Sequence, residues 1–250
     1  ELVMKCHCDF LTIKSSKRHD LSNPITLAFA NLRDGINNHP EHEYVTTSEE
    51  ADVVFVFGSI TQRKLDTERA GRILKHRHEG KHIFALDSGL FSPYIRNATN
   101  QSETNFFRIG YKDITGEGNF LNDNSTKDRY EWFKETYKFS EKEPKSYNEG
   151  DILFILQSEK GWQYDNTEPY YFWAQKVVAR IRSITDRKII LRAHPNTDRN
   201  PTGWIASGFE NIEITYGDRG RANVIDAIRK AGAVVTHSSS AAVESIVEGI

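Results

Sequence analysis

The stretch "DILFILQ", residues 151–157, places an uninterrupted apolar run between an aspartate and a glutamine. A continuous run of this length is typical of a strand buried on both faces of a parallel sheet. Residues 168–185 follow with apolar side chains at helical spacing, which predicts a covering helix. Further strands are predicted at 188–195, 211–216 and 232–238, and a further helix at 221–232. This alternation predicts one α/β unit.

The same pattern precedes that stretch. Strands are predicted at 2–13, 51–59 and 81–87, and helices at 23–36 and 66–80. The first helix has an Asn23 cap followed by Pro24, and the second ends at Gly80. Residues 96–150 are mostly polar, with one predicted helix at 126–139 and a linker at 140–150. We therefore predict two Rossmann-like domains, at 1–150 and 151–250.

Composition excludes several classes of protein. The 250 residues carry a formal net charge of −2, so no overall positive field attracts nucleic acid or an anionic membrane. No apolar stretch is long enough to span a bilayer, and we expect a cytoplasmic protein. Cys6 and Cys8 flank His7, but no second Cys/His pair follows at ligand spacing, so we predict no metal site. Free thiols in a reducing compartment are the favoured interpretation.

Polar residues follow three of the predicted strands, at the edge where open parallel sheets bind ligands. These segments are "LDSGLF" with Asp87, "RAHPN" with Arg192 and His194, and "THSSSAAVE" at 236–244. Pro195 holds His194 on a stiff turn, where its imidazole is placed to donate to a phosphate. The alternative for each segment is a cap or turn whose polar group is satisfied locally.

The serine segment is hard to explain by capping alone. With Ser240 as N-cap, a capping box requires an acid or amide at residue 243, which is Val243. Glu244 stands one position later, while Ser238 and Ser239 add hydroxyls that a single cap does not use. A helix start with several hydroxyl and N–H donors is a phosphate site, and a nearby carboxylate suits ribose hydroxyls.

These residues carry a resemblance. The "HP" at 194–195 and the paired serines at 238–240 resemble the motifs of bacterial sialyltransferases and capsule-polysaccharide transferases of the GT-B fold. The resemblance implies a donor site for a UDP- or CMP-sugar and no other cofactor. In it His194, Ser238, Ser239 and Ser240 contact phosphate and Glu244 contacts ribose. We expect Arg192, on the same strand as His194, to be a further phosphate contact. The family pattern continues past the position of Ile250, so we expect an incomplete second domain.

The first domain would then hold the acceptor, with Asp87 as the catalytic base and His194 stabilising the leaving phosphate. On a helical projection Arg69, Arg72 and His76 share a face, which predicts either an ordinary solvated surface or a polyanion-binding patch. The acceptor is left open between a bacterial glycan and a hydroxymethylated base of phage DNA, in a bacterial or phage-infected cell. A sugar-nucleotide epimerase and a non-catalytic nucleotide- or glycan-binding module are the alternatives.

Overall fold

The computed structural model describes residues 3–58, 68–89, 107–114, 118–119, 124–146, 149–157, 168–194, 199–216 and 222–250. Its contacts divide the chain into two compact units, with the boundary between Glu131 and Trp132. Both units are α/β with parallel strands, which confirms the predicted fold class. The roles predicted for residues 1–150 and 151–250 stay predictions. None of the described helices has the length and apolar character that a membrane crossing requires.

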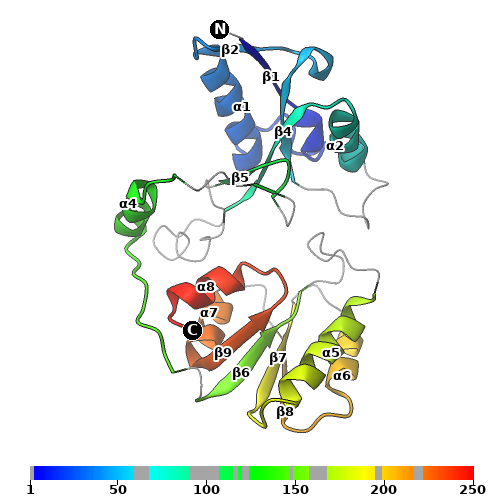
Figure 1. The fold of residues 1–250 in the computed structure, drawn as a ribbon, viewed down its shortest axis with the longest axis vertical. Helices are drawn as coiled ribbons and strands as arrows, with labels where there is room; N and C mark the ends of the chain where they lie inside the picture. The colour runs from blue at the N-terminus through cyan, green and yellow to red at the C-terminus, as the bar shows by residue number, and fades with distance from the viewer. Residues whose placement is uncertain are drawn as a thin grey trace. The chain divides into compact units, whose positions relative to one another are not determined.

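The first unit contains a five-stranded sheet in the order β2-β1-β3-β4-β5. Its strands are β1 (Met4–Cys8), β2 (His42–Tyr44), β3 (Val53–Phe57), β4 (His82–Ser88) and β5 (Phe107–Tyr111). The first four are parallel, and β5 is an antiparallel edge strand. Helices α1 (Pro24–Asn37) and α2 (Glu68–His78) cover opposite faces of the sheet (Figure 1). This is a doubly wound arrangement.

Local signals explain where the helices of this unit begin and end. The Asn23 side chain accepts a hydrogen bond from the Ile25 N–H at 3.2 Å, so α1 has its predicted cap. Gly80 has φ +72°, the left-handed conformation predicted for the end of α2. The strand predicted at 2–13 is wrong beyond Cys8, because the Asp9 side chain accepts from the Leu11 N–H and starts a short 3₁₀ helix, η1 (Phe10–Thr12).

The second unit contains a four-stranded parallel sheet in the order β8-β7-β6-β9. The strands are β6 (Asp151–Ile155), β7 (Ile189–Ala193), β8 (Ile212–Tyr216) and β9 (Ala231–Thr236). The helices are α4 (Asp128–Tyr137), which crosses the boundary between units, α5 (Tyr170–Arg182), α6 (Arg199–Ala206), α7 (Ala222–Lys230) and α8 (Ala241–Val247). In chain order the strands run third, second, first, fourth, which is the Rossmann order.

Alternation along β6 explains its continuous apolar run. Phe154 lies in the core cluster that α5 and α6 contribute to, whereas Leu153 and Ile155 lie in the cluster with α7 and α8. Successive side chains of a strand point to opposite faces, and both faces are covered (Figure 1). Each apolar side chain buried in this way contributes roughly 1.5–3 kcal/mol to stability.

Gly232 corrects one predicted boundary. We predicted it as the glycine that ends the helix at 221–232, but α7 ends at Lys230 and Gly232 lies inside β9. The register against β6 shifts here, and a Cβ at Gly232 would lie 1.6 Å from the Glu149 carbonyl oxygen. Gly232 is therefore needed for a bulge and a close backbone approach.

The segment after α4 is attached to the end of the chain within the second unit. The Lys142 N–H donates to the Val247 carbonyl at 2.9 Å. Glu248, which is 1% exposed, accepts hydrogen bonds from Arg229 at 2.9 and 3.0 Å and also pairs with Lys142. The polar run predicted as a linker thus has defined contacts over part of its length.

Candidate functional site

Strand order selects one place on the second sheet. The chain order reverses between β6 and β9, and ligands of open α/β sheets bind outside the carboxyl ends of the strands at such a switch point. Gln157 follows β6 and Ser238 follows β9. The Gln157 Oε1 accepts from the Ser238 N–H at 3.2 Å and from the Ser238 hydroxyl at 3.1 Å. These bonds join the two strand ends at the point where the fold predicts a ligand.

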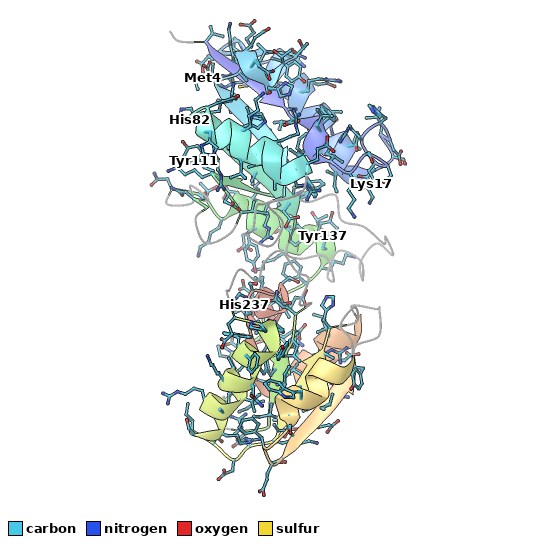
Figure 2. All side chains as sticks on the ribbon, turned by 90° about the vertical axis from the view of Figure 1, so that its right-hand side faces the viewer. Met4, Lys17, His82, Tyr111, Tyr137 and His237 are labelled. Carbon is cyan, nitrogen blue, oxygen red and sulfur yellow. The ribbon has the colours of Figure 1, made fainter. Side chains whose placement is uncertain are left out.

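Aromatic side chains of α5 form one wall of this edge. The Gln157 N–H donates to the Tyr170 hydroxyl at 2.8 Å, and Tyr170 stacks on Trp173 with ring centroids 5.4 Å apart. His237 stands at the end of the second sheet, its ring perpendicular to Trp173 at 5.0 Å (Figure 2). Its Nδ1 lies 3.0 Å from the Ser238 hydroxyl, so the imidazole is held by both packing and a hydrogen bond.

The three serines have three different environments. Ser238 is engaged by Gln157 as described. The Ser239 hydroxyl accepts from the Ala241 N–H at 3.3 Å and so caps the first turn of α8. Ser240, the position from which the capping box was counted, has helical dihedral angles and makes no side-chain cap bond. The capping side chain is therefore Ser239, one residue earlier.

Arg192 and Glu244 lie on the same face of the second sheet. Arg192 alternates along β7 with Ile190, which packs in one cluster with Ala241 of α8. Glu244 is 2% exposed and Arg192 is 8% exposed. The Ser240 hydroxyl lies 3.5 Å from the Glu244 Oε1. A cation and a carboxylate are thus both buried beside the edge predicted for phosphate and ribose, and their contacts with a nucleotide stay predictions.

His194 directly follows β7, the strand next to β6. Partial burial lowers the pKa of its imidazole below the usual value of 6.5. A neutral imidazole donates from one nitrogen only, which suits a single contact to a phosphate oxygen. Pro195, the second residue of the predicted motif, lies outside the described residues.

In the first unit, Asp87 lies within β4 and opposite Arg108 of β5. The Arg108 guanidinium donates to the Asp87 carboxylate at 2.8 Å, and the Asp87 side chain is 17% exposed. The catalytic role of Asp87 stays a prediction, and it requires an acceptor that competes with Arg108.

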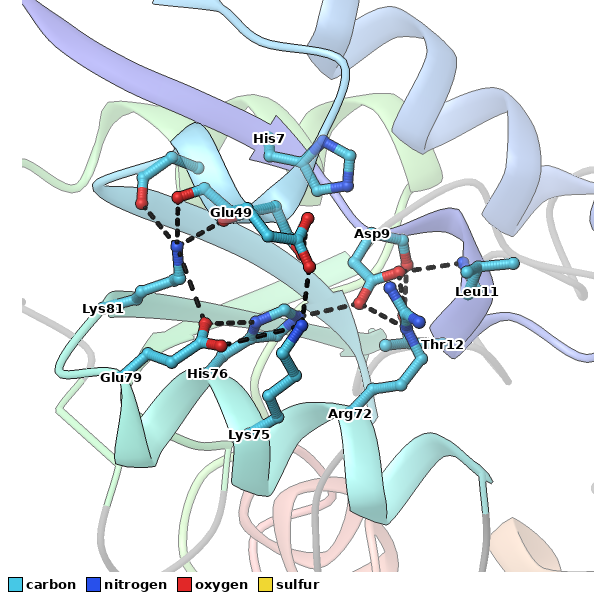
Figure 3. Close-up of polar contacts among 12 residues, drawn as sticks. His7, Asp9, Leu11, Thr12, Glu49, Arg72, Lys75, His76, Glu79 and Lys81 are labelled. Carbon is cyan, nitrogen blue, oxygen red and sulfur yellow. Dashed lines mark hydrogen bonds and ion pairs between the residues drawn. The ribbon is translucent and has the colours of Figure 1, made fainter.

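The predicted basic face of α2 needs a correction. His76 is 1% exposed and its Nε2 lies 2.9 Å from the Asp9 carboxylate, so it contributes nothing to a solvated surface. Arg72 Nε donates to both Asp9 oxygens, at 2.8 and 3.1 Å (Figure 3). Arg69 donates from Nε to the Thr12 carbonyl at 2.7 Å. The helical projection correctly placed these residues on one face of α2. That face packs against Asp9 and Thr12, which follow β1, so it is not a fully solvated surface.

Asp9 lies at the switch point of the first sheet, between the ends of β1 and β3. It is 1% exposed. Burial by itself raises the pKa of this carboxyl, but the hydrogen bonds and charges of His76 and Arg72 outweigh burial and lower it below the usual value. The charged groups at this edge therefore satisfy one another.

The Cys6-His7-Cys8 segment does not converge on a metal. Cys6 and Cys8 pack in the core cluster that α1 contributes to, while the His7 Nδ1 lies 3.0 Å from the Val45 carbonyl. Burial, together with the neighbouring Cys6, raises the pKa of the Cys8 thiol to about 12. Within the described ranges no three His, Cys, Asp or Glu side chains are grouped as metal ligands.

Sequence reasoning missed Gln157, Tyr170 and Trp173 as members of the site. A polar residue at the carboxyl end of a buried strand was a visible signal for Gln157. Its partner Ser238 lies 81 residues away, and no local pattern shows that contact.

No protein-family model matches the chain, and no curated protein matches its sequence. Among solved structures, a Listeria monocytogenes protein assigned to the UDP-N-acetylglucosamine 2-epimerases aligns with a TM-score of 0.33 and 13% identity, over 96% of this chain and 76% of its own.

Two further epimerase structures align at a similar level. The Methanocaldococcus jannaschii UDP-GlcNAc 2-epimerase, in complex with UDP-GlcNAc and UDP, gives a TM-score of 0.35 and 15% identity, over 88% of this chain and 61% of its own. The Neisseria meningitidis enzyme bound to UDP-GlcNAc aligns with a TM-score of 0.31 and 11% identity, over 96% of this chain and 78% of its own. Similarities this low do not assign the chain to a family.

Proposed function

We propose that the second unit binds a nucleotide sugar at the carboxyl ends of β6 and β9, and that the protein transfers the sugar to an acceptor hydroxyl. The observation that carries the proposal is the hydrogen-bonded pair of Gln157 and Ser238 at the switch point of a sheet in Rossmann order. The resemblance of the segments at 194–195 and 238–240 to GT-B donor motifs supports the choice of a nucleotide sugar.

In this proposal His194, Ser239 and Ser240 contact the donor phosphates, and Ser238, whose N–H and hydroxyl both donate to Gln157, holds the serine segment in position. Hydrogen-bond donors aimed at a phosphate leaving group stabilise the charge that develops as the glycosidic bond breaks. Arg192 adds a buried positive charge on the same sheet, and Glu244 is the proposed ribose contact. Because a hydrogen bond to a charged group contributes about 1.5–3 kcal/mol, each phosphate contact is expected to change affinity roughly 10- to 100-fold.

The acceptor side of the proposal rests on Asp87. A base must take the proton of the acceptor hydroxyl, and Asp87 is the proposed group. The Arg108 guanidinium is paired with the Asp87 carboxylate, so the acceptor hydroxyl has to compete with Arg108 for it. Because His76 is buried and Arg72 is paired with Asp9, the α2 face gives little support to a polyanionic acceptor such as DNA.

A donor panel tests the proposal. We would incubate the full chain with UDP-, GDP- and CMP-sugars and follow loss of donor and release of free nucleotide. Hydrolysis or transfer with one donor is expected, and Ser238→Ala should lower kcat/KM by about tenfold or more. Ser207→Ala, which removes an exposed hydroxyl after α6, is the matched control and should have no effect.

The same panel separates the alternatives. Three of the solved structures that align with this chain carry the name UDP-GlcNAc 2-epimerase, so the product analysis should also test for the 2-epimer of UDP-GlcNAc. Formation of that epimer without release of UDP would replace the transferase with an epimerase. Measurable nucleotide binding without loss of any donor would indicate a binding module and overturn the proposal.

A further inference from the structure

Arg69, in the first turn of α2, lies over the carboxyl end of β3 in the first unit. Its Nε donates to the Thr12 carbonyl at 2.7 Å, and its guanidinium carbon lies 5.4 Å from the centroid of the Phe57 ring. The residue after Phe57, Gly58, donates its N–H to the Leu86 carbonyl of β4 at 2.7 Å. A hydrogen bond and an aromatic face therefore hold the guanidinium beside the ends of β3 and β4.

Gly58 leaves space for the Arg69 guanidinium. A Cβ on residue 58 would lie 2.8 Å from the Arg69 Nη1, so a side chain there would displace the guanidinium. Gly58 also has φ +85°, a left-handed conformation that residues with a Cβ rarely adopt. The close approach of backbone and guanidinium at this strand end thus depends on glycine.

The described carboxylates at these strand ends already have arginine partners. Asp9, which follows β1, is paired with Arg72. Asp87 of β4 is paired with Arg108 at 2.8 Å. Among the described residues, no hydrogen bond or ion pair involves the two Nη atoms of Arg69. Arg69 therefore adds one positive charge that no carboxylate of the described chain neutralises.

The environment of Arg69 favours an anionic partner. Partial burial lowers the pKa of its guanidinium, and the nearby Asp87 carboxylate raises it. Arginine stays protonated at neutral pH, so the charge is present and partly desolvated. Because Nε is bonded to Thr12, the N–H groups of the two Nη atoms form the remaining fork, which matches the two oxygens of a carboxylate.

We propose that Arg69 binds the carboxylate of an acidic sugar, and that this sugar is the acceptor. The inference rests on the proposed transferase function and names its acceptor class. A carboxylate carries one negative charge, which matches the single cation without a partner, whereas a doubly charged phosphate leaves an excess charge near Asp87. Binding at Arg69 positions the acceptor beside Asp87, the proposed base.

Titration of the full chain with sodium glucuronate, glucose 6-phosphate and glucose, at equal ionic strength, tests the site without any donor. Arginine Nε–H signals in ¹H–¹⁵N spectra report binding, and Arg69→Lys identifies the signal of residue 69 by its loss. We expect this signal to shift strongly with glucuronate, weakly with glucose 6-phosphate and not with glucose. Tighter binding of the phosphate would overturn the carboxylate assignment, and no shift with either anion would overturn the inference.

Variants test whether Arg69 makes the contact. Arg69→Gln removes the charge and the fork, so it should weaken glucuronate binding at least tenfold, as measured by the amide shift of Gly58. Arg69→Lys keeps the charge without the fork and should fall between this variant and wild type. Arg33→Gln, which removes an exposed guanidinium of α1, is the matched control and should bind as wild type.

A purely structural Arg69 predicts a different result. Its bond to Thr12 could attach α2 without any ligand, and glucuronate would then bind wild type and Arg69→Gln equally, which would overturn the inference. If Arg69→Gln does not fold, Arg69→Lys decides the question, because an ammonium group cannot hold two oxygens in a fork. Equal glucuronate affinity of wild type and Arg69→Lys would then count against the site.

Transfer assays distinguish failure of this inference from failure of the proposed function. With the donor that the panel identifies, glucuronate should be used with a higher kcat/KM than glucose, and Arg69→Gln should remove that preference. Preferential use of glucose by wild type would overturn the acceptor assignment. If no donor supports transfer, the proposed function fails, and the titration still decides whether Arg69 binds a carboxylate.

Discussion

At the switch point of the first sheet the buried polar side chain is a carboxylate, Asp9, whereas at the switch point of the second it is an amide, Gln157. Asp9 is surrounded by charged or chargeable partners, Arg72 and His76, that belong to the helix packed beside it. Gln157 is bonded to Tyr170 and Ser238, which are neutral.

This difference agrees with our proposal that the Asp9 pairs of the first edge are structural and that the second edge binds the nucleotide sugar. Charges at the first edge neutralise one another, and their main consequence is to attach α2 to the end of β1. Neutral groups at the second edge hold a histidine and a serine segment in place without adding a charge of their own. In the proposed site an anionic ligand with hydroxyl groups fits the second edge better, because Arg192 offers it a positive charge and Glu244 an acceptor for hydroxyl groups.

The largest expected effect comes from breaking the charged edge. Asp9→Ala leaves Arg72 and His76 without their buried partner, which should lower the free energy of unfolding of the first unit by about 3–5 kcal/mol. Urea unfolding of the full chain measures this loss, with the alkylation of Cys6 and Cys8 as the probe of unfolding. Both cysteines of the protein are buried in the first unit and become reactive when it opens.

Asp34→Ala is the matched control for this change. Asp34 pairs with Arg33 at 3.0 Å, but both side chains are largely exposed, so the effect should stay within about 0.5 kcal/mol. All four tryptophans lie at or after residue 132, so their fluorescence reports the second unit. A loss below about 1 kcal/mol for Asp9→Ala would mean that the charged edge does not hold α2.

Acid should destabilise the two units over different pH ranges. The pKa of Asp9 is lowered in the folded chain, so its stabilisation is complete above about 3.8 and is lost as the pH falls through the folded value. His194 and His237 have pKa values lowered by burial, so folding opposes their protonation and stability is lost as the pH falls below about 6.5.

Urea midpoints measured at a series of pH values with the two probes check this difference. Tryptophan fluorescence should report a loss of stability that begins near pH 6.5. Reaction of the cysteines with an aromatic disulfide reagent that remains active in acid, used here in place of alkylation, should report one that begins near pH 3.8. Glu248, whose lowered pKa results from Arg229 and Lys142 outweighing burial, adds a second loss below 4.5 in the second unit. Replacing both His194 and His237 with glutamine should remove the loss of stability that begins near pH 6.5. If that loss persists in the double variant, other groups cause it.

The smallest expected effect is on ligand affinity alone. His194→Gln should weaken binding of the preferred nucleotide sugar by about tenfold and leave the urea midpoint nearly unchanged, because the side chain is only partly buried. Calorimetric titration measures the affinity, and His78→Gln on the exposed side of α2 is the control. Unchanged affinity would remove His194 from the donor site.

Elements whose signal is local could be predicted from the sequence. Buried parallel strands appear as apolar runs, and the Asn23 cap and Gly80 mark helix ends by their own backbone chemistry. Strands β2 and β5, at the edges of the first sheet, were not predicted, because neither HEY nor FRIGY is a continuous apolar run. Helix α6 was also missed, since Pro201 and Gly203 lie within it.

The candidate site was predictable only in part. His194 and Ser238 could be placed near a sheet edge because each follows a predicted strand. Ligands of open parallel sheets bind at the carboxyl ends of the strands, and those ends can be read from the order of elements in the chain. The hydrogen-bond partners of these residues were not predictable. Gln157 bonds to Ser238, and Asp9 to His76, across long separations in sequence. For that reason the helical projection correctly grouped Arg72 with His76 but could not show that Asp9 engages them.

Hydrogen exchange of the full chain, with and without the preferred nucleotide sugar, tests the central claim most directly. Ligand should slow exchange in peptides covering residues 152–157 and 234–245, at the ends of β6 and β9, and leave peptides of residues 4–12 unchanged. Protection confined to the region around Asp9, or binding that leaves both β6 and β9 ends unprotected, would contradict the assignment of the donor site to the second sheet.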